Sequence, residues 1–223
     1  DCGMFQWAAE GRNDGPFSFD PSKIDYLLVT HAHMDHVGRI PKLVKEGFTG
    51  IVCTTEATRD LVEIILLDSA KIMREDYETT YKKAQRRGKE GEVKLPLYDE
   101  DDLEAAFDLT WKYPEYDKPL KLREGLTVTY RNAGHILGSA FIEIAYLERG
   151  VEQTIVFSGD IGNDNDMVMP DLSKCPQANT LYVESTYGDR NHKDTEASIT
   201  EFKRVIIDTL RIGGNVLIDS FDV

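Results

Sequence analysis

The sequence predicts an α/β fold in which helices cover a layered pair of sheets. Strand-like and helix-like segments alternate at both ends of the 223-residue chain, whereas strand-like segments cluster in its middle. Apolar residues make up 41% of the chain, which is enough for one sizeable core. This arrangement favours an α/β layered sandwich.

The first quarter of the chain predicts two short strands around a short helix. Residues 1–20 are glycine-rich and loop-like. The apolar run 26–29 reads as a buried strand, and residues 50–53 read as a second strand. Between them, residues 37–46 predict a helix that Gly47 ends.

A long helix is predicted over residues 55–87, because apolar residues recur there close to the 3.6-residue helical period. Its later part mixes acidic and basic residues, so a solvated face is favoured over a phosphate-contacting arm. A short acidic helix is predicted over residues 99–111, and a proline-marked loop over residues 113–121.

The second half of the chain predicts strands and then one helix. Apolar residues alternate or form short runs in four predicted strands, 126–130, 141–146, 153–158 and 180–183. An amphipathic helix is predicted over residues 196–211, and a last strand over residues 215–221.

Three of the five histidines fall within residues 31–36, directly after the first strand. His31 and His33 are two residues apart, so their rings point to the same side of an extended loop. Asp35 and His36 follow after a bend and can face a second point nearby. Imidazole nitrogen and carboxylate oxygen suit zinc, so the spacing predicts two zinc ions. The alternative is a polar loop with scattered histidines, which this density disfavours.

Two further residues can complete this site. Glycines around His135 let the backbone bend tightly and approach a ligand, which makes His135 a candidate third histidine for the first metal. Asp160 ends a strand between two glycines, and each of its carboxylate oxygens can take one cation. The alternative role for Asp160 is to cap a loop.

Two carboxylates remain ambiguous from their sequence positions. Glu184 ends a predicted strand, where it can orient a histidine general acid or cap the following loop. Asp1 can accept a hydrogen bond from the ring N–H of a ligand histidine, or it can be an ordinary loop aspartate.

Charge and cysteine content limit the class of protein. The net charge of −14 argues against nucleic-acid binding when taken alone, although two Zn²⁺ would add four local positive charges. Cys2, Cys53 and Cys175 form no CxxC pair, so a reducing cytoplasm is expected. No apolar run approaches the roughly 18 residues that cross a membrane, so no membrane partner is expected.

Four motifs occur in an order that resembles one family. They are His-Ala-His-Met-Asp-His at 31–36, Gly-His-Ile-Leu-Gly-Ser-Ala at 134–140, Ser-Gly-Asp-Ile-Gly at 158–162 and Glu-Ser-Thr-Tyr-Gly at 184–188. Together they look like the β-CASP branch of the metallo-β-lactamase superfamily. Asp-Cys-Gly-Met-Phe at 1–5 is similar to the family's first motif, and Leu-Asp-Ser-Ala at 67–70 to a helix segment of its RNA-processing members.

The resemblance implies an αββα sandwich with two zinc ions. By similarity, His31, His33 and His135 bind the first zinc. Asp35 and His36 bind the second, and Asp160 bridges the two. Asp35, Asp160 and Glu184 are then the catalytic carboxylates within this chain, and Asp1 is the supporting acid of the first motif. A glutamate at position 184 resembles RNA-acting members, since DNA-acting members tend to carry aspartate.

The resemblance also implies a function, that of a zinc-dependent ribonuclease similar to the mRNA 3′-end cleavage endonuclease and its bacterial and archaeal relatives. A hydroxide activated by two zincs would hydrolyse phosphodiester bonds of single-stranded RNA by endo or 5′-exo cleavage, in RNA processing or decay. A homodimer stays open.

The resemblance makes residues 1–223 a partial metallo-β-lactamase domain, incomplete at both ends. The family's inserted β-CASP domain and the C-terminal part of the sandwich are absent, so the fragment alone is not expected to be a competent enzyme. Two alternatives are a thioester or lactone hydrolase of the same superfamily and an inactive RNA-binding partner subunit.

Overall fold

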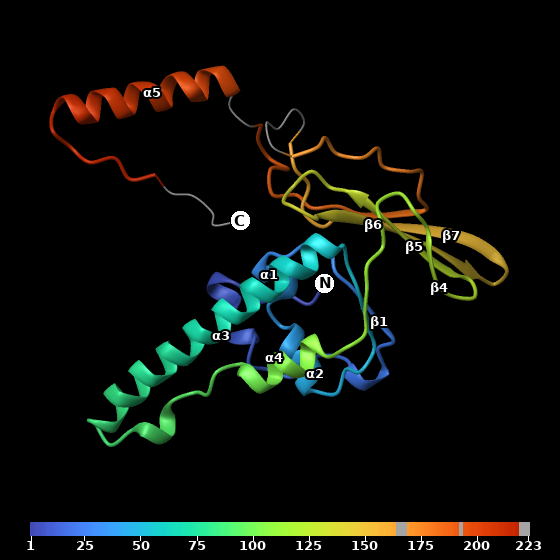
Figure 1. Ribbon diagram of the computed structural model, residues 1–223, viewed down its shortest axis with the longest axis horizontal. Coiled ribbons are helices and arrows are strands. Elements are labelled where there is room, and N and C mark those ends of the chain that lie inside the picture. Colours follow the sequence, from blue (N-terminus) through green and yellow to red (C-terminus); the bar gives the residue numbers. More distant parts are fainter. Residues whose placement is uncertain (164–168, 192–193, 219–223) are drawn as a thin grey trace. The chain divides into compact units, whose positions relative to one another are not determined.

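The computed structural model describes residues 1–163, 169–191 and 194–218. The chain divides into two units, Asp1–Val183 and Glu184–Val223, and each is described by itself. The first unit holds two sheets and the helices α1 to α4, whereas the second holds α5 (Figure 1).

A three-stranded parallel sheet carries the first histidine loop. Its strands lie in the order β1 (Tyr26–Leu28), β2 (Ile51–Cys53) and β3 (Trp111–Lys112). Successive side chains of a strand point to opposite faces, so Leu27 and Val52 pack against the helices while Leu28 and Cys53 pack toward the second sheet. The sheet is therefore buried on both faces.

Four α-helices belong to the first unit: α1 (Met34–Val37), α2 (Ile40–Lys45), α3 (Glu56–Gln85) and α4 (Glu100–Phe107). The helix predicted over 37–46 is present as α2 but begins only at Ile40, with Pro41 in its first turn, and the separate one-turn helix α1, which ends at Val37, was missed. Gly47, at a φ of +108°, ends α2 as predicted. Three short 3₁₀ turns complete the helical set: η1 (Trp7–Arg12), η2 (Pro21–Lys23) and η3 (Glu90–Glu92).

The long helix predicted over residues 55–87 is confirmed as α3. The Thr55 hydroxyl caps it by accepting from the Thr58 N–H at 3.2 Å. Val62 and Leu66 are fully buried against the three-stranded sheet, whereas the charged later half of α3 is mostly exposed. This exposure matches the predicted solvated face.

A five-stranded sheet forms the second layer, in the order β4 (Leu120–Arg123), β5 (Leu126–Asn132), β6 (Ala140–Glu148), β7 (Val151–Phe157) and β8 (Thr180–Tyr182). Its neighbours are antiparallel except β7 and β8, which pair in parallel. The four predicted strands are confirmed. Two strands were missed: β4 had been assigned to the 113–121 loop, and β3 to the end of the 99–111 helix, which stops at Phe107.

The two sheets pack through a second apolar cluster of Cys53, Val128, Tyr130, Ala140 and Ile142. The Tyr130 hydroxyl donates to the Cys53 carbonyl at 2.6 Å, and the Ala140 N–H donates to the Thr30 carbonyl at 2.8 Å. The first unit is thus a helix–sheet–sheet arrangement. This packing brings the end of β1 next to the loop between β5 and β6.

The second unit is built on α5 (Thr195–Arg211), which confirms the last predicted helix. The predicted strand over 215–221 is wrong in its described part, since residues 215–218 form no strand and Leu217 is 94% exposed. A strand needs a paired neighbour, and these residues have none within the described structure. Residues 219–221 lie outside the described residues. Because α5 belongs to a separately described unit, the fourth layer of the predicted αββα sandwich remains a prediction.

No helix among the described residues is both long enough and apolar enough to cross a membrane.

Candidate metal centre

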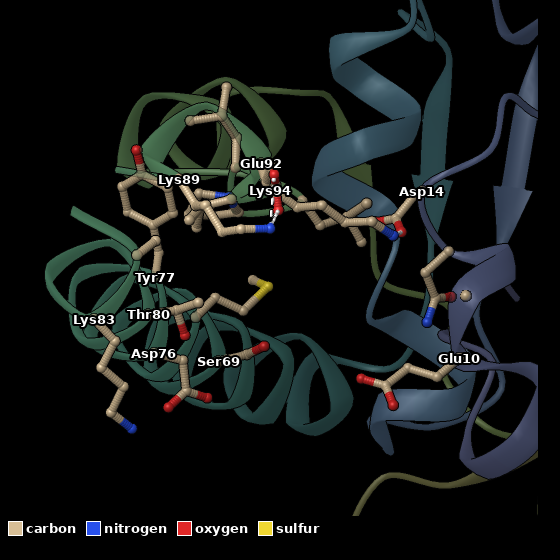
Figure 2. Close-up of a pocket in the computed structure, with 18 of the residues that line it drawn as sticks. Glu10, Asp14, Ser69, Asp76, Tyr77, Thr80, Lys83, Lys89, Glu92 and Lys94 are labelled. Carbon is tan, nitrogen blue, oxygen red and sulfur yellow. Dashed lines mark hydrogen bonds and ion pairs between the residues drawn. The ribbon is translucent and has the colours of Figure 1, made fainter. Parts of the chain in front are cut away.

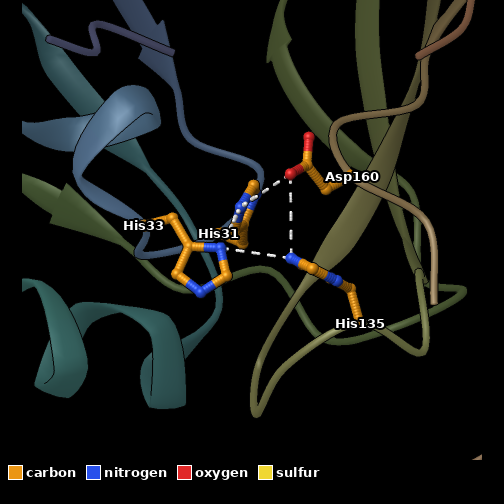
Figure 3. A group of neighbouring side chains, drawn as sticks. All are labelled: His31, His33, His135 and Asp160. Atoms are coloured by element: carbon orange, nitrogen blue, oxygen red, sulfur yellow. Dashed lines mark hydrogen bonds and ion pairs between the residues drawn. The ribbon is translucent and has the colours of Figure 1, made fainter. Parts of the chain in front are cut away.

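The predicted ligands of the first metal lie at the carboxyl ends of three strands. His31 and His33 follow β1, and His33 stands directly before α1. His135 lies in the loop between β5 and β6, and Asp160 follows β7. Figure 3 shows His31, His33, His135 and Asp160 pointing toward one another from these separate segments.

These four side chains can each direct one ligand atom to a common point, with all four atoms within 4.8 Å of one another. His33 Nδ1 lies 3.0 Å from His31 Nε2 and 3.1 Å from His135 Nε2. Asp160 Oδ2 lies 3.9 Å and 3.8 Å from those two Nε2 atoms. Ligands about 2.0–2.1 Å from a tetrahedral zinc would be about 3.3 Å apart, so the donor set fits zinc in type and spacing.

Asp160 also faces a second group with its other oxygen. Its Oδ1 lies 3.2 Å from His36 Nε2, whereas its Oδ2 is the oxygen nearest His31 and His135. Asp160 therefore stands between the His31, His33 and His135 group and His36. Asp35 is exposed and lies outside the four-residue cluster, so its predicted ligand role is carried only by its position beside His36.

Asp1 and Thr30 orient the imidazole rings of His36 and His31 through contacts with their Nδ1 atoms. Asp1 Oδ2 lies 2.8 Å from His36 Nδ1, and Asp1 Oδ1 accepts from the Thr30 N–H at 2.7 Å. The Thr30 hydroxyl donates to Asp1 Oδ2 at 2.9 Å and lies 3.0 Å from His31 Nδ1. Partners on Nδ1 leave the Nε2 atoms of both histidines directed toward Asp160. Thr30 was missed at the sequence level, because a threonine beside a histidine gives no signal of its own.

The His135 loop is fixed by hydroxyl groups. Ser139 Oγ accepts from the backbone N–H groups of His135 and Ile136, at 3.1 Å each. The Gly138 carbonyl accepts from the hydroxyls of Thr55 and Thr58, at 2.7 and 2.8 Å. Sequence reasoning missed these three hydroxyl residues, which tie the ligand loop to the start of α3.

Close backbone contact joins the His135 and Asp160 loops. The Gly162 N–H donates to the Ala133 carbonyl at 2.9 Å. A Cβ atom on Gly162 would lie 1.7 Å from the Gly134 carbonyl oxygen, so no side chain fits there. The absence of a side chain at position 162 therefore lets the two loops pack backbone against backbone.

Burial sets the charge of the site. Desolvation, followed by the proximity of His36, lowers the pKa of His31 to about 2, and desolvation also lowers the pKa of His33. The hydrogen bond with His36 is the main cause that lowers the pKa of Asp160 to about 2. Neutral imidazoles therefore face an ionised carboxylate at neutral pH, which is the protonation state that metal binding requires.

Glu184 belongs to the second unit, where its Oε2 accepts from the Thr186 N–H at 3.4 Å. Its predicted role toward a histidine general acid therefore remains a prediction.

A larger hollow, of about 920 Å³, lies between the later part of α3 and residues 89–97 (Figure 2). Its charges are of both signs and partly paired, as in Lys94 with Asp14 at 2.5 Å and Lys89 with Glu92 at 3.2 Å. It includes none of the metal-centre residues, and its paired lysines do not form a dedicated phosphate site.

Comparison with known proteins identifies the family of this fold. Residues 9–115 match the profile of the Metallo-beta-lactamase superfamily. Among solved structures, the subclass B3 metallo-β-lactamase BJP-1 of Bradyrhizobium japonicum is 20% identical, with a TM-score of 0.36 over 62% of this chain and 42% of that one.

Curated relatives match along the whole chain or nearly so. Ribonuclease TTHA0252 of Thermus thermophilus is 41% identical over 100% of this chain and 46% of its own length. Transcription termination factor FttA of Methanocaldococcus jannaschii is 34% identical over 100% of this chain and 33% of its own length. Endoribonuclease ysh1 of Schizosaccharomyces pombe is 33% identical over 96% of this chain and 26% of its own length. The chain thus spans less than half the length of these relatives. The match over residues 9–115 is to the metallo-β-lactamase superfamily, the same superfamily that the sequence motifs resemble.

Proposed function

We propose that the intact protein containing this chain is a zinc-dependent ribonuclease that hydrolyses phosphodiester bonds of single-stranded RNA, in RNA processing or decay. The observation that carries the proposal is Asp160, whose Oδ2 lies nearest His31 and His135 while its Oδ1 lies nearest His36. The names ribonuclease and endoribonuclease among its relatives support an RNA substrate. These relatives also support membership of the β-CASP branch.

Our proposal includes two zinc sites. His31, His33 and His135 would hold the first ion, Asp35 and His36 the second, and Asp160 would contact both. Zinc, when bound, supplies positive charge opposite the phosphate oxygens and lowers the pKa of a water to about 7.

The protein's own groups hold this site in place. Asp1 keeps His36 Nε2 directed toward Asp160, and Thr30 holds both Asp1 and His31. A water that has released one proton to the solvent would attack phosphorus in line with the leaving oxygen; the new bond from oxygen to phosphorus forms as the bond from phosphorus to the leaving oxygen breaks. A histidine elsewhere in the intact protein, oriented by Glu184, donates a proton to the leaving oxygen.

Cysteine chemistry supports a cytoplasmic location for this activity. All three cysteines are free, and Cys2 and Cys53 are buried. Free thiols of this kind persist in a reducing compartment.

The test is Asp160→Asn in the intact, zinc-loaded protein. Asparagine keeps the shape of the side chain but removes its charge and one acceptor oxygen. We expect lower zinc content and a loss of RNA cleavage of about 100-fold or more, since even residues around metal ligands contribute about 10- to 100-fold. The matched control is Asp108→Asn, which changes an exposed aspartate at the end of α4 and should leave both unchanged.

End-labelled single-stranded RNA, matched DNA and a simple thioester distinguish the alternatives. Thioester turnover without cleavage of either nucleic acid would indicate a small-molecule hydrolase. Bound zinc without any activity would indicate an inactive partner subunit. Full zinc content and full RNA cleavage in Asp160→Asn would show that Asp160 does not bridge.

A further inference from the structure

A hollow of about 350 Å³ adjoins the second histidine group of the metal centre. Asp1, Asp35 and His36 line one side of it. Its lining also includes three aromatic rings and one guanidinium group, those of Phe5, Phe17, Phe19 and Arg39. We call this space the aromatic hollow.

Arg39 is held between two of these rings. Its guanidinium carbon lies 4.5 Å from the ring centroid of Phe5 and 5.0 Å from that of Phe17. Its Nε donates to the Gly3 carbonyl at 2.6 Å, so the planar group is fixed in orientation. Arg12 lies 4.0 Å over the Phe5 ring as well. Such arginine–aromatic stacks present flat faces that also carry positive charge.

These arginines keep their charge available for a ligand. Among the described residues, neither Arg12 nor Arg39 forms an ion pair with a carboxylate, whereas Arg131 is paired with both Glu143 and Asp117. In a chain with a net charge of −14, these two guanidinium groups supply positive charge around the Phe5 ring. They complement an anionic ligand.

Phe19 leaves ring surface available at the edge of the hollow. It is 48% exposed, and its ring lies 5.2 Å from that of Phe17 at an interplanar angle of 37°. If the rings served core packing alone, Phe19 would be covered in the same way as Phe48, which is fully buried. A half-exposed ring next to a fixed guanidinium is a surface on which a flat, apolar group can stack.

We propose that the aromatic hollow binds an unpaired nucleobase of the RNA strand next to the scissile phosphate. The base stacks on Phe19, and Arg39 and Arg12 attract the neighbouring phosphates. This inference rests on the proposed ribonuclease function. Asp35 and His36 line the hollow and are also proposed metal ligands, so a base bound in the hollow would position the RNA strand at the metal centre.

The first test measures equilibrium binding of the intact protein to single-stranded RNA with a cleavage-resistant sulfur-substituted linkage. Phe19→Ala should weaken binding about tenfold, within the range for one base stacked on an aromatic ring. Phe19→Leu keeps apolar bulk without a ring and should weaken binding similarly, whereas Phe19→Tyr should retain it. The matched control is Trp7→Ala, which removes an aromatic side chain that is 89% exposed and lies outside the hollow.

The second test asks whether Phe19 meets a base. RNA with an abasic nucleotide beside the cut position should bind about tenfold more weakly to the unchanged protein. The same RNA should show no further loss with Phe19→Leu, because the stacking partner is already absent. The zinc content and thermal unfolding of Phe19→Leu should match those of the unchanged protein.

The outcomes separate this inference from the proposed function. If the unchanged protein neither binds nor cleaves RNA, both fail. If it binds and cleaves RNA but Phe19→Leu binds as well as the unchanged protein, only the nucleobase site is wrong. The nucleobase site would also be wrong if the abasic nucleotide weakened RNA binding equally in the unchanged protein and in Phe19→Leu. The base would then be recognised elsewhere.

Discussion

Thr30 shows how single residues outside the ligand set control the metal centre. Its backbone N–H and its hydroxyl both bond Asp1, and the same hydroxyl lies beside His31 Nδ1. Its side chain also packs against Gly159, just before Asp160. One threonine thus contacts both the histidine loop and the aspartate loop.

The Gly162→Ala substitution tests the contact between the two ligand loops. A methyl group there would overlap the Gly134 carbonyl oxygen, so the loops that carry His135 and Asp160 must separate. We expect a loss of about 1–3 kcal/mol in the free energy of unfolding, as for other overpacked sites, together with weaker zinc binding. Denaturant unfolding and zinc titration of the intact protein measure the two effects.

Gly91→Ala is the control for this change, since a Cβ atom on Gly91 would meet nothing within 4 Å. If Gly162→Ala bound zinc as tightly as Gly91→Ala does, the loops would not depend on close contact.

Among single residues, the sequence indicated the candidate metal ligands but not the hydroxyl groups that hold them in place. His31 and His33 stood out by their density after a strand, whereas His135 and Asp160 became candidates only together with them, and the structure brings these four side chains together. The hydroxyls that hold them were not found. A threonine or serine acquires its role from partners distant in sequence, as in the 83 residues between Thr55 and Gly138.

Among the elements, the helix α3 is connected to the metal centre through the residue that caps its N-terminus. Thr55 caps the helix and donates its hydroxyl to Gly138, three residues beyond His135. The start of α3 therefore supports a ligand loop as well as the helix itself.

Thr55→Ala should reveal this double role. Loss of the cap should lower the free energy of unfolding by about 1 kcal/mol. Because the Gly138 carbonyl also loses a donor, zinc affinity should fall. Calorimetric unfolding and zinc competition measure these two quantities.

The matched variant is Asp99→Ala, which removes the side-chain cap of α4 without touching the His135 loop. Equal zinc affinity in Thr55→Ala and Asp99→Ala would show that the Gly138 contact does not support the site.

Most elements could be predicted because apolar periodicity is local. The strands β1, β2 and β5 to β8 and the helices α3, α4 and α5 followed from it. The two-residue strand β3 could not, because it exists only through parallel pairing with β2, and two residues show no periodicity. The strand β4 follows Pro119, which favoured a loop, but pairing with β5 makes it a strand.

For the molecule as a whole, the buried histidines make the stability of the zinc-free protein depend on pH. The pKa of His31 falls from 6.5 to about 2 on folding. Below pH 6.5 the unfolded chain therefore binds a proton at His31, whereas the folded protein does not. Stability should therefore fall as pH falls from 7.5 to 5.5. The slope should approach about 1.4 kcal/mol per pH unit for each such proton.

Chemical denaturation of the zinc-free intact protein at pH 7.5 and 5.5 checks this expectation. Asp160 stays ionised across this range in both states, because its pKa lies at or below 3.8. His31→Gln removes the main titrating group and should flatten the dependence. A slope unchanged by that substitution would assign the pH effect to other groups.

The net charge of the molecule does not describe how charge is distributed over its surface. The value of −14 argued against a nucleic-acid ligand, yet the histidine cluster and the unpaired Arg12 and Arg39 concentrate cationic or metal-binding groups on one part of the first unit. Total charge is a sum over the surface and does not report where its members gather.

The spread of the four ligands along the chain has a consequence during synthesis. The ribosome adds roughly 5–20 residues per second, so Asp160 emerges several seconds after His31 and His33. During most of that interval the nascent chain carries His31 and His33 without His135 and Asp160, the two side chains that join them in the folded protein. The four-residue cluster can therefore form only late in synthesis, once Asp160 has emerged.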